Sequence, residues 1–265
     1  MQSAQKEFWA VQPRRFDNQC EPLSDLYVLR TKNRKLASRQ SSLHRDLRHA
    51  YELMFEHIGH RHWWPAETPF EVCVGAILTQ NTSWSNVERA ISNLKRENLL
   101  EPVRLFAVPE SQLAKLLRPA GYFNVKARRL RSFLKVLVED YGGQLKRLFD
   151  GTTEAVRERL LAINGIGPET ADSMLLYAGG HARFVIDAYT RRIFHRHGWC
   201  ALEAKYSDLQ TICEGALNHK SPGERLDYWQ DCHAQFVAVG HRYCRPKNPR
   251  CEVCPLKPLL RRAAA

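Results

Sequence analysis

The stretch LLAINGIGPETADSMLLYAGGHARFVIDAYTRRI, residues 160–193, decides the fold. Its pattern predicts the end of one helix, a tight turn at NGIGP, a second helix over residues 169–178 and a third helix that starts near residue 188. We expect Gly165 and Gly167 in the turn to adopt backbone angles that other residues avoid. Two antiparallel helices joined by so short a turn form a helix-hairpin-helix unit.

The turn between these two helices is a candidate phosphate site. Backbone N–H groups at the start of the second helix point outward at the positive end of the helix dipole, an arrangement that binds phosphate without reading base sequence. The longer pattern L-L-x-I-x-G-I-G-P-x-T-A favours a hairpin that binds the DNA backbone over an ordinary tight turn. The residues expected to contact DNA here are Gly165, Ile166, Gly167 and Thr170.

The composition also favours a polyanionic partner. The chain of 265 residues contains 40 Lys and Arg against 28 Asp and Glu, which gives a formal net charge of +12. An excess of this size points to nucleic acid, with an anionic membrane surface well behind. No apolar run approaches the roughly 20 residues that span a bilayer, and the N-terminus has no secretory-signal pattern. We therefore expect a cytoplasmic protein, associated with the nucleoid through DNA and with no membrane partner.

Most of the chain is predicted to be helical. Apolar residues recur at spacings of three and four, no segment alternates like a strand, and the loops are short and contain Gly or Pro, which indicates a compact all-α protein. Residues 1–43 have no such stripe and include the basic run VLRTKNRKLASRQSS, so we expect a flexible basic arm that either adds phosphate affinity or is simply a poorly ordered terminus. Helices are expected at 46–58, 70–78, 84–95, 110–120, 125–141, 153–163, 169–179, 188–197, 205–218 and 226–240.

A single aspartate, Asp187, precedes the third helix of the opening stretch. Its simplest role is to cap the N-terminus of that helix. It follows Glu169 by eighteen residues, the length of one helix and a return loop, so its carboxylate can also face the hairpin. A carboxylate in that position can stabilise an oxocarbenium-like sugar and activate water, which hydrolysis of an N-glycosidic bond requires.

Four motifs occur in a characteristic order: GAILTQNTSW, INGIGPETAD, VIDAYTRRI and a C-terminal C-x6-C-x2-C. From about residue 46 to 256, the chain resembles the endonuclease III, or helix-hairpin-helix-GPD, superfamily of DNA glycosylases. The resemblance implies an all-α fold of two helical domains, a six-helix barrel and a domain formed from both chain ends. It also implies that double-stranded DNA with base damage is bound in the cleft between the domains.

The resemblance suggests domain boundaries. The six-helix barrel is expected over residues 62–181, with the helix-hairpin-helix at about 155–179. The second helical domain is expected to combine residues 44–61 with 182–265 and to contain the cysteine loop, residues 244–254. We expect the protein to be a monomer.

The resemblance gives Glu169 a particular meaning. Bifunctional members carry a lysine at the matching position in the second hairpin helix, and its amine forms a Schiff base with the sugar. A carboxylate cannot form a Schiff base, and no lysine lies between Lys146 and Lys205. The resemblance therefore implies a monofunctional glycosylase with Asp187 as its catalytic carboxylate. The alternatives are an endonuclease III-like glycosylase and abasic-site lyase for oxidised pyrimidines, and a non-catalytic module that binds lesions.

The stretch HWWPAETPFEVCVGAILTQNTSWSNV resembles the branch that includes 3-methyladenine DNA glycosylases, which implies alkylated purines as substrates. Such purines are cationic, so Trp63 and Trp64 can stack on the flipped ring while Pro65 shapes the pocket. The alternative is that both tryptophans pack at the end of a helix. Gln80 matches the position of a family residue that fills the gap left by the flipped nucleotide; the alternative is a solvated helix end.

Three cysteines near the C-terminus, Cys244, Cys251 and Cys254, have the spacing of a loop around a metal centre. In cluster-bearing relatives a fourth cysteine lies six positions after the third, where this chain has Leu260. Three interpretations stay open: a [4Fe-4S] cluster with a fourth ligand from elsewhere, zinc with mixed Cys and His ligation, or no metal. Candidates for the fourth ligand are Cys232, His233 and His241.

Overall fold

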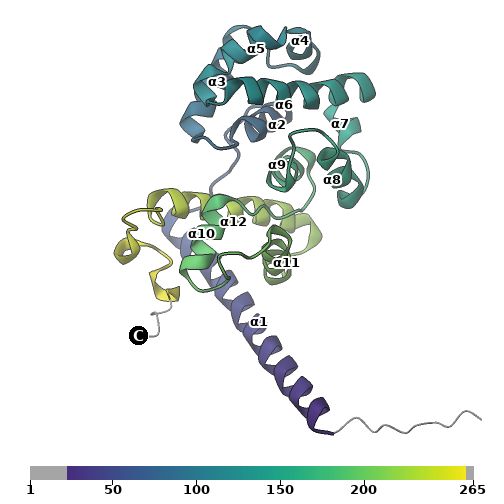
Figure 1. The fold of residues 1–265 in the computed structure, drawn as a ribbon. Helices are drawn as coiled ribbons and strands as arrows, with labels where there is room; N and C mark the ends of the chain where they lie inside the picture. Colours follow the sequence, from purple (N-terminus) through teal and green to yellow (C-terminus); the bar gives the residue numbers. More distant parts are fainter. Residues whose placement is uncertain (1–22, 261–265) are drawn as a thin grey trace, which may run out of the picture. The chain divides into compact units, whose positions relative to one another are not determined.

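The computed structural model describes residues 23–260, with side chains described from residue 40 onward. The chain divides into two units, Met1–Ser41 and Ser42–Ala265, and the sites described below belong to the second. The described residues contain α-helices, short 3-10 and π turns and no strand, so the predicted all-α class is confirmed (Figure 1). The α-helices are α1 (Leu23–Ile58), α2 (Pro69–Leu78), α3 (Trp84–Arg96), α4 (Pro102–Ala107), α5 (Glu110–Leu116), α6 (Phe123–Lys135), α7 (Leu145–Leu148), α8 (Thr153–Leu161), α9 (Pro168–Met174), α10 (Ala188–Arg196), α11 (Tyr206–Ala216) and α12 (Pro222–Arg242).

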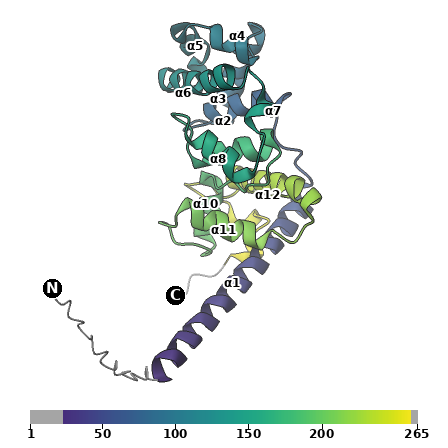
Figure 2. The ribbon, with the colours of Figure 1, turned by 90° about the vertical axis from the view of Figure 1, so that its right-hand side faces the viewer.

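The helices of the second unit surround two separate apolar cores. Helices α2 to α9, most of which carry labels in Figure 2, enclose the first core. This core includes Ile77, Leu130 and Phe133, all fully buried. Helices α10 to α12 and the C-terminal part of α1 enclose the second, which includes Phe194 and Phe236. Because burial of apolar surface is the main driving force of folding, each group of helices has its own source of stability.

The hairpin between α8 and α9 depends on one glycine. Gly165 has a φ of +90°, and a Cβ atom at this position would lie 2.3 Å from Cγ of Arg129. Both the backbone angle and the close approach therefore require glycine. Gly167 has a φ of −96° and open space around its Cα, so the prediction that it needs a special backbone angle is wrong. Gly167 is instead the N-cap of α9, which Pro168 opens.

Two short helices, α4 and α7, are absent from the sequence-based prediction. Helix α4 has six residues and α7 has four, lengths at which helical periodicity gives little signal. The start of α4 has a local cause, since the carboxylate of Glu101 accepts hydrogen bonds from the amides of Val103 and Arg104. Pro102 occupies the first helical position, where its missing N–H costs nothing.

Helix α1 begins at Leu23, inside the segment 1–43 that the sequence predicts to be a flexible basic arm. The segment is rich in Leu, Arg, Lys and Ala, which are strong helix formers, although they form no apolar stripe. The part of the predicted arm before residue 23 lies outside the described residues. Among the helices that the structure describes, none has the length and apolar character that a membrane-spanning helix needs.

Candidate active site and cysteine loop

Asp187 lies at the N-terminus of α10, as the sequence predicts. Its Oδ1 atom accepts a hydrogen bond of 2.7 Å from the backbone amide of Thr190, so the carboxylate caps the helix. The second oxygen, Oδ2, is not used by the cap and lies 3.7 Å from Nε2 of His233, while 13% of the side chain stays exposed. One carboxylate oxygen is therefore fixed by the backbone, and the other is available for chemistry.

His233 links this carboxylate to a buried tyrosine. The Tyr177 hydroxyl lies 2.7 Å from Nδ1 of His233 and 3.0 Å from the carbonyl oxygen of Gln230. Burial, aided by the charge of Asp187, raises the pKa of Tyr177 well above its ordinary value, so the phenol keeps its proton. Because the phenol donates its one proton to the Gln230 carbonyl, its oxygen can accept a hydrogen bond from Nδ1 of His233, and Nε2 of the same ring faces the carboxylate of Asp187.

The surroundings of Asp187 keep it ionised. Burial alone would raise the pKa of this carboxyl, but His233 and the Thr190 amide outweigh that effect and hold the pKa below its ordinary value. Asp187 is therefore a carboxylate at neutral pH. It can serve as a general base or as a negative charge next to a developing cation.

Glu169 lies in the first turn of α9 and has the opposite electrostatic character. Its side chain is exposed, yet the surrounding protein atoms and then the negative charge of Asp187 raise its pKa to about 7. The two carboxyl groups therefore interact electrostatically. One of them is ionised near neutral pH, and the other is partly protonated.

Three tryptophans lie beside Tyr177. The rings of Trp63 and Trp84 are 6.0 Å apart, Trp64 and Trp84 are 5.3 Å apart in an edge-to-face arrangement, and Trp64 lies 5.2 Å from Tyr177. All three indoles are half-buried, and Trp64 and Trp84 also pack against the first core. Pro65 is exposed. Trp64 thus packs against the first core and also contacts Tyr177, the residue that pairs with His233 beside Asp187.

Gln80 is hydrogen-bonded to the hairpin. Its amide Nε2 donates to the Gly165 carbonyl at 3.1 Å and to the Thr170 hydroxyl at 2.9 Å, and its Oε1 accepts from Arg129. The side chains of Thr170 and Ile166 are buried, so both face the protein. The part of the hairpin that faces solvent is the backbone around the two glycines.

A buried ion pair braces the hairpin. The carboxylate of Asp172 in α9 accepts two hydrogen bonds from Arg157 in α8, at 2.6 and 3.1 Å. It also accepts hydrogen bonds from Tyr206 and Gln210 of α11, each at 2.8 Å. Asp172 is fully buried, and these four hydrogen bonds from three side chains satisfy its charge. The network joins the hairpin, which packs in the first core, to α11 of the second.

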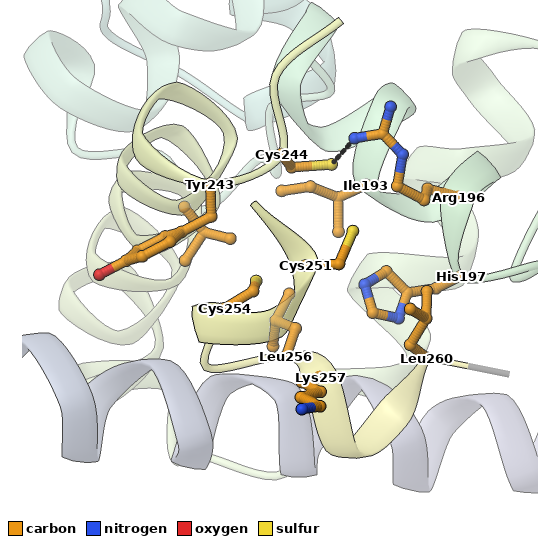
Figure 3. Close-up of a pocket in the computed structure, with 11 residues that line it drawn as sticks. Ile193, Arg196, His197, Tyr243, Cys244, Cys251, Cys254, Leu256, Lys257 and Leu260 are labelled. Carbon is orange, nitrogen blue, oxygen red and sulfur yellow. Dashed lines mark hydrogen bonds between the residues drawn. The ribbon is translucent and has the colours of Figure 1, made fainter. Parts of the chain in front are cut away.

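The three cysteines of the loop surround one small space beside the C-terminal end of α10 (Figure 3). Arg196 donates a hydrogen bond of 3.0 Å to Sγ of Cys244. His197 lines the same space, and its Nδ1 atom is buried without a hydrogen-bond partner. Three thiols and an unpartnered imidazole nitrogen are suitable donors for an iron–sulfur cluster.

This space does not have the arrangement of a single metal ion. Among the residues that the structure describes, no three His, Cys, Asp or Glu side chains are grouped closely enough to hold one. The candidate fourth ligands named from the sequence also lie elsewhere: Cys232 is buried in the second core and His233 contacts Tyr177. His241 is exposed and lines a different, basic depression.

Sequence reasoning missed the contributions of three residues to these sites: Trp84, Tyr177 and His197. Trp84 directly follows the LTQNTS run, and Gly75 of the same motif lies against it, since a Cβ atom at Gly75 would be 3.4 Å from the rings of Trp64 and Trp84. Tyr177 and His197 gave no local signal. Their roles come from partners on other helices.

The chain is similar to several known proteins. A family model described as HhH-GPD superfamily base excision DNA repair protein matches residues 74–219. A putative DNA repair glycosylase of Methanocaldococcus jannaschii is 48% identical over 208 residues, which cover 78% of this chain and 92% of that protein. The Helicobacter pylori 3-methyladenine DNA glycosylase bound to 1,N6-ethenoadenine superposes with a TM-score of 0.65 at 26% identity, covering 76% of this chain and 97% of the other. An endonuclease III in a non-covalent DNA complex gives a TM-score of 0.69 at 22% identity, over 82% and 95% of the two chains, and shares the fold.

Proposed function

Because the chain belongs to the HhH-GPD superfamily of base excision DNA repair proteins, and is accordingly a DNA glycosylase, we propose that it is monofunctional and removes alkylated purines from double-stranded DNA. One observation carries this proposal. The hairpin helix presents a carboxyl group, Glu169, beside the ionised Asp187, where a lyase needs an amine. The site can therefore hydrolyse the bond between base and sugar but has no nucleophile on the hairpin to form a Schiff base.

Asp187 performs the central step. As the bond between base and sugar lengthens, positive charge develops on the sugar, and the ionised carboxylate beside it lowers the energy of that state. The free Oδ2 atom also accepts a proton from an attacking water molecule. His233 and Tyr177 fix the orientation of the carboxylate from its buried side. The products are the free base and an intact abasic site.

The aromatic residues suit a cationic base. An N-alkylated purine carries positive charge, and the faces of Trp63, Trp64 and Trp84 attract cations more strongly than they attract neutral rings. The positive charge also weakens the glycosidic bond, so the leaving base needs little assistance from an acid. The likeness to a 3-methyladenine DNA glycosylase at 26% identity supports the same substrate class. Pro65, exposed beside the indoles, borders this base pocket.

DNA contacts are proposed for both groups of helices. The hairpin backbone at Gly165 and Gly167 faces solvent and suits a phosphate, while Gln80 lies directly behind it. Gln80 would leave its hairpin contacts to fill the space of the flipped nucleotide. On the other group, the cysteine loop exposes three basic side chains: Arg245, Lys247 and Arg250. A cofactor in that loop would act by holding these side chains against phosphates.

The decisive experiment uses DNA duplexes that carry either a 3-methyladenine-type lesion or an oxidised pyrimidine. Released base and strand breaks are measured separately, with and without later alkali treatment. We expect release of the alkylated purine, strand breakage only after alkali, and no protein–DNA adduct on borohydride reduction. Strand breakage without alkali would refute monofunctional hydrolysis. Preference for the oxidised pyrimidine would refute the proposed substrate class.

A further inference from the structure

The cysteine loop lacks its expected fourth thiol, and the structure shows what stands there instead. Leu260 lies six residues after Cys254, at the position of the missing cysteine, and lines the space between the three sulfurs. Its side chain has no donor atom. A cluster held here therefore needs a fourth ligand from another part of the chain.

His197 lies across this space from the cysteine loop. It is the C-cap residue of α10, and only 5% of it is exposed. Trp199 packs against one face of its ring at a centroid distance of 4.8 Å, which fixes the plane of the imidazole. In Figure 3 the ring lies next to Cys251, between that residue and Leu260.

The Nδ1 atom of His197 has an unexplained energetic cost. It is buried and has no hydrogen-bond partner, although the ring interacts with the backbone of Leu259, and leaving a buried polar atom unpartnered is costly. Such an atom in a folded protein indicates a ligand or a functional role. Here the atom belongs to a residue that lines a space with three thiols, so a metal centre accounts for it.

The other polar side chains around this space are already engaged. The Tyr243 hydroxyl pairs with His57 at 3.0 Å, and the Lys257 amine donates to Glu252 at 2.7 Å. Arg196 donates to Cys244 and cannot bind a metal, because a guanidinium has no free lone pair. His197 is therefore the remaining donor among the residues that line the space.

We propose that Cys244, Cys251, Cys254 and Nδ1 of His197 hold a [4Fe-4S] cluster. A cluster suits the site better than zinc, because zinc needs all ligands within about 2.0–2.3 Å of one atom and the described side chains are not grouped that closely. The four irons of a cluster keep the ligands further apart. The hydrogen bond from Arg196 to Cys244 adds a donor to a ligating sulfur, which raises the reduction potential of a cluster.

The proposal is tested on the full chain purified without oxygen. Iron, acid-labile sulfide and zinc are measured per chain, together with visible absorption and electron paramagnetic resonance. For the wild type we expect four irons and, in the reduced state, a nitrogen coupling that changes when histidine is labelled with ¹⁵N. Zinc alone, no metal, or a cluster without nitrogen coupling would each overturn the proposal.

Variants provide an independent measurement. We expect His197→Ala to lose one iron and give the spectrum of a three-iron cluster, or to lose the cluster entirely. His197→Cys, and Leu260→Cys in the His197→Ala background, should restore four irons without nitrogen coupling. His195→Ala, an exposed histidine on the same helix, is the matched control and should leave the metal unchanged. A His197→Ala protein with the wild-type iron content and spectrum would show that His197 is not a ligand.

Discussion

Asp187 and Glu169 stand at the starts of two neighbouring helices, yet their environments drive their pKa values in opposite directions. One carboxylate oxygen of Asp187 caps α10 and the other faces His233, and the pKa of this carboxyl lies below its ordinary value. Among the residues that the structure describes, none forms a hydrogen bond or ion pair with the Glu169 carboxyl in the first turn of α9, and burial together with the charge of Asp187 raises its pKa to about 7. Position at a helix start therefore does not decide the role of a carboxylate. Its partners do.

The largest expected effect comes from removing the charge of Asp187. Asn is as good an N-cap as Asp, so Asp187→Asn should keep α10 and the fold. It removes the negative charge and the base, and we expect base release to fall by at least about 10²-fold. Single-turnover assays measure this loss. Asp208→Asn, an exposed aspartate in the first turn of α11, is the control. Unchanged base release by Asp187→Asn would remove Asp187 from the mechanism.

A second variant changes the chemistry of the other carboxyl. Glu169→Lys places an amine on the hairpin beside Asp187, the arrangement that Schiff-base formation needs. We expect a covalent protein–DNA adduct on borohydride reduction in this variant and none in Glu169→Gln. Electrophoresis of the reduced mixture detects it. An adduct formed by the wild type would show that another amine reaches the sugar and that Glu169 does not limit the reaction.

The sequence predicts the helix-capping role of Asp187 better than it predicts the raised pKa of Glu169. The Asp187 cap and the hairpin glycine at Gly165 follow from residues adjacent in the chain, and the structure confirms both. The raised pKa of Glu169 follows from packing, and the link from Tyr177 to His233 joins residues 56 positions apart. Such contacts depend on how α12 packs, which no local pattern contains. Only a long helix repeats its apolar spacing. The long helices could therefore be predicted from the sequence, and the short helix α4 could not.

Weakening the hydrogen bonds that support Asp187 should raise the pKa of Asp187 and so bring it closer to that of Glu169. Tyr177→Phe removes the hydroxyl, and with it the contact to Nδ1 of His233 and the hydrogen bond to the Gln230 carbonyl, each worth about 1 kcal/mol. We expect base release to fall roughly 5-fold to 10-fold and the acid limb of the rate profile to move to higher pH, because His233 then lowers the pKa of Asp187 less effectively. Rates measured across the acid range test this, with the exposed Tyr122→Phe as the control. A lower rate with an unmoved acid limb would mean that Tyr177 only packs.

The smallest effect is on stability. Since the pKa of Glu169 rises from 4.5 to about 7 on folding, the folded protein binds this proton more tightly than the unfolded chain does. The group's contribution to stability is therefore complete below about pH 4.5, declines as the pH rises toward 7, and is lost above it. Glu169→Gln cannot ionise, so its Tm should exceed that of the wild type at pH 8 and by much less at pH 5. Thermal unfolding at both pH values measures the difference, with Glu158→Gln on the exposed face of α8 as the control. An equal Tm difference at the two pH values would mean that folding does not raise the pKa of Glu169, and that the opposition between the two carboxylates has no energetic content.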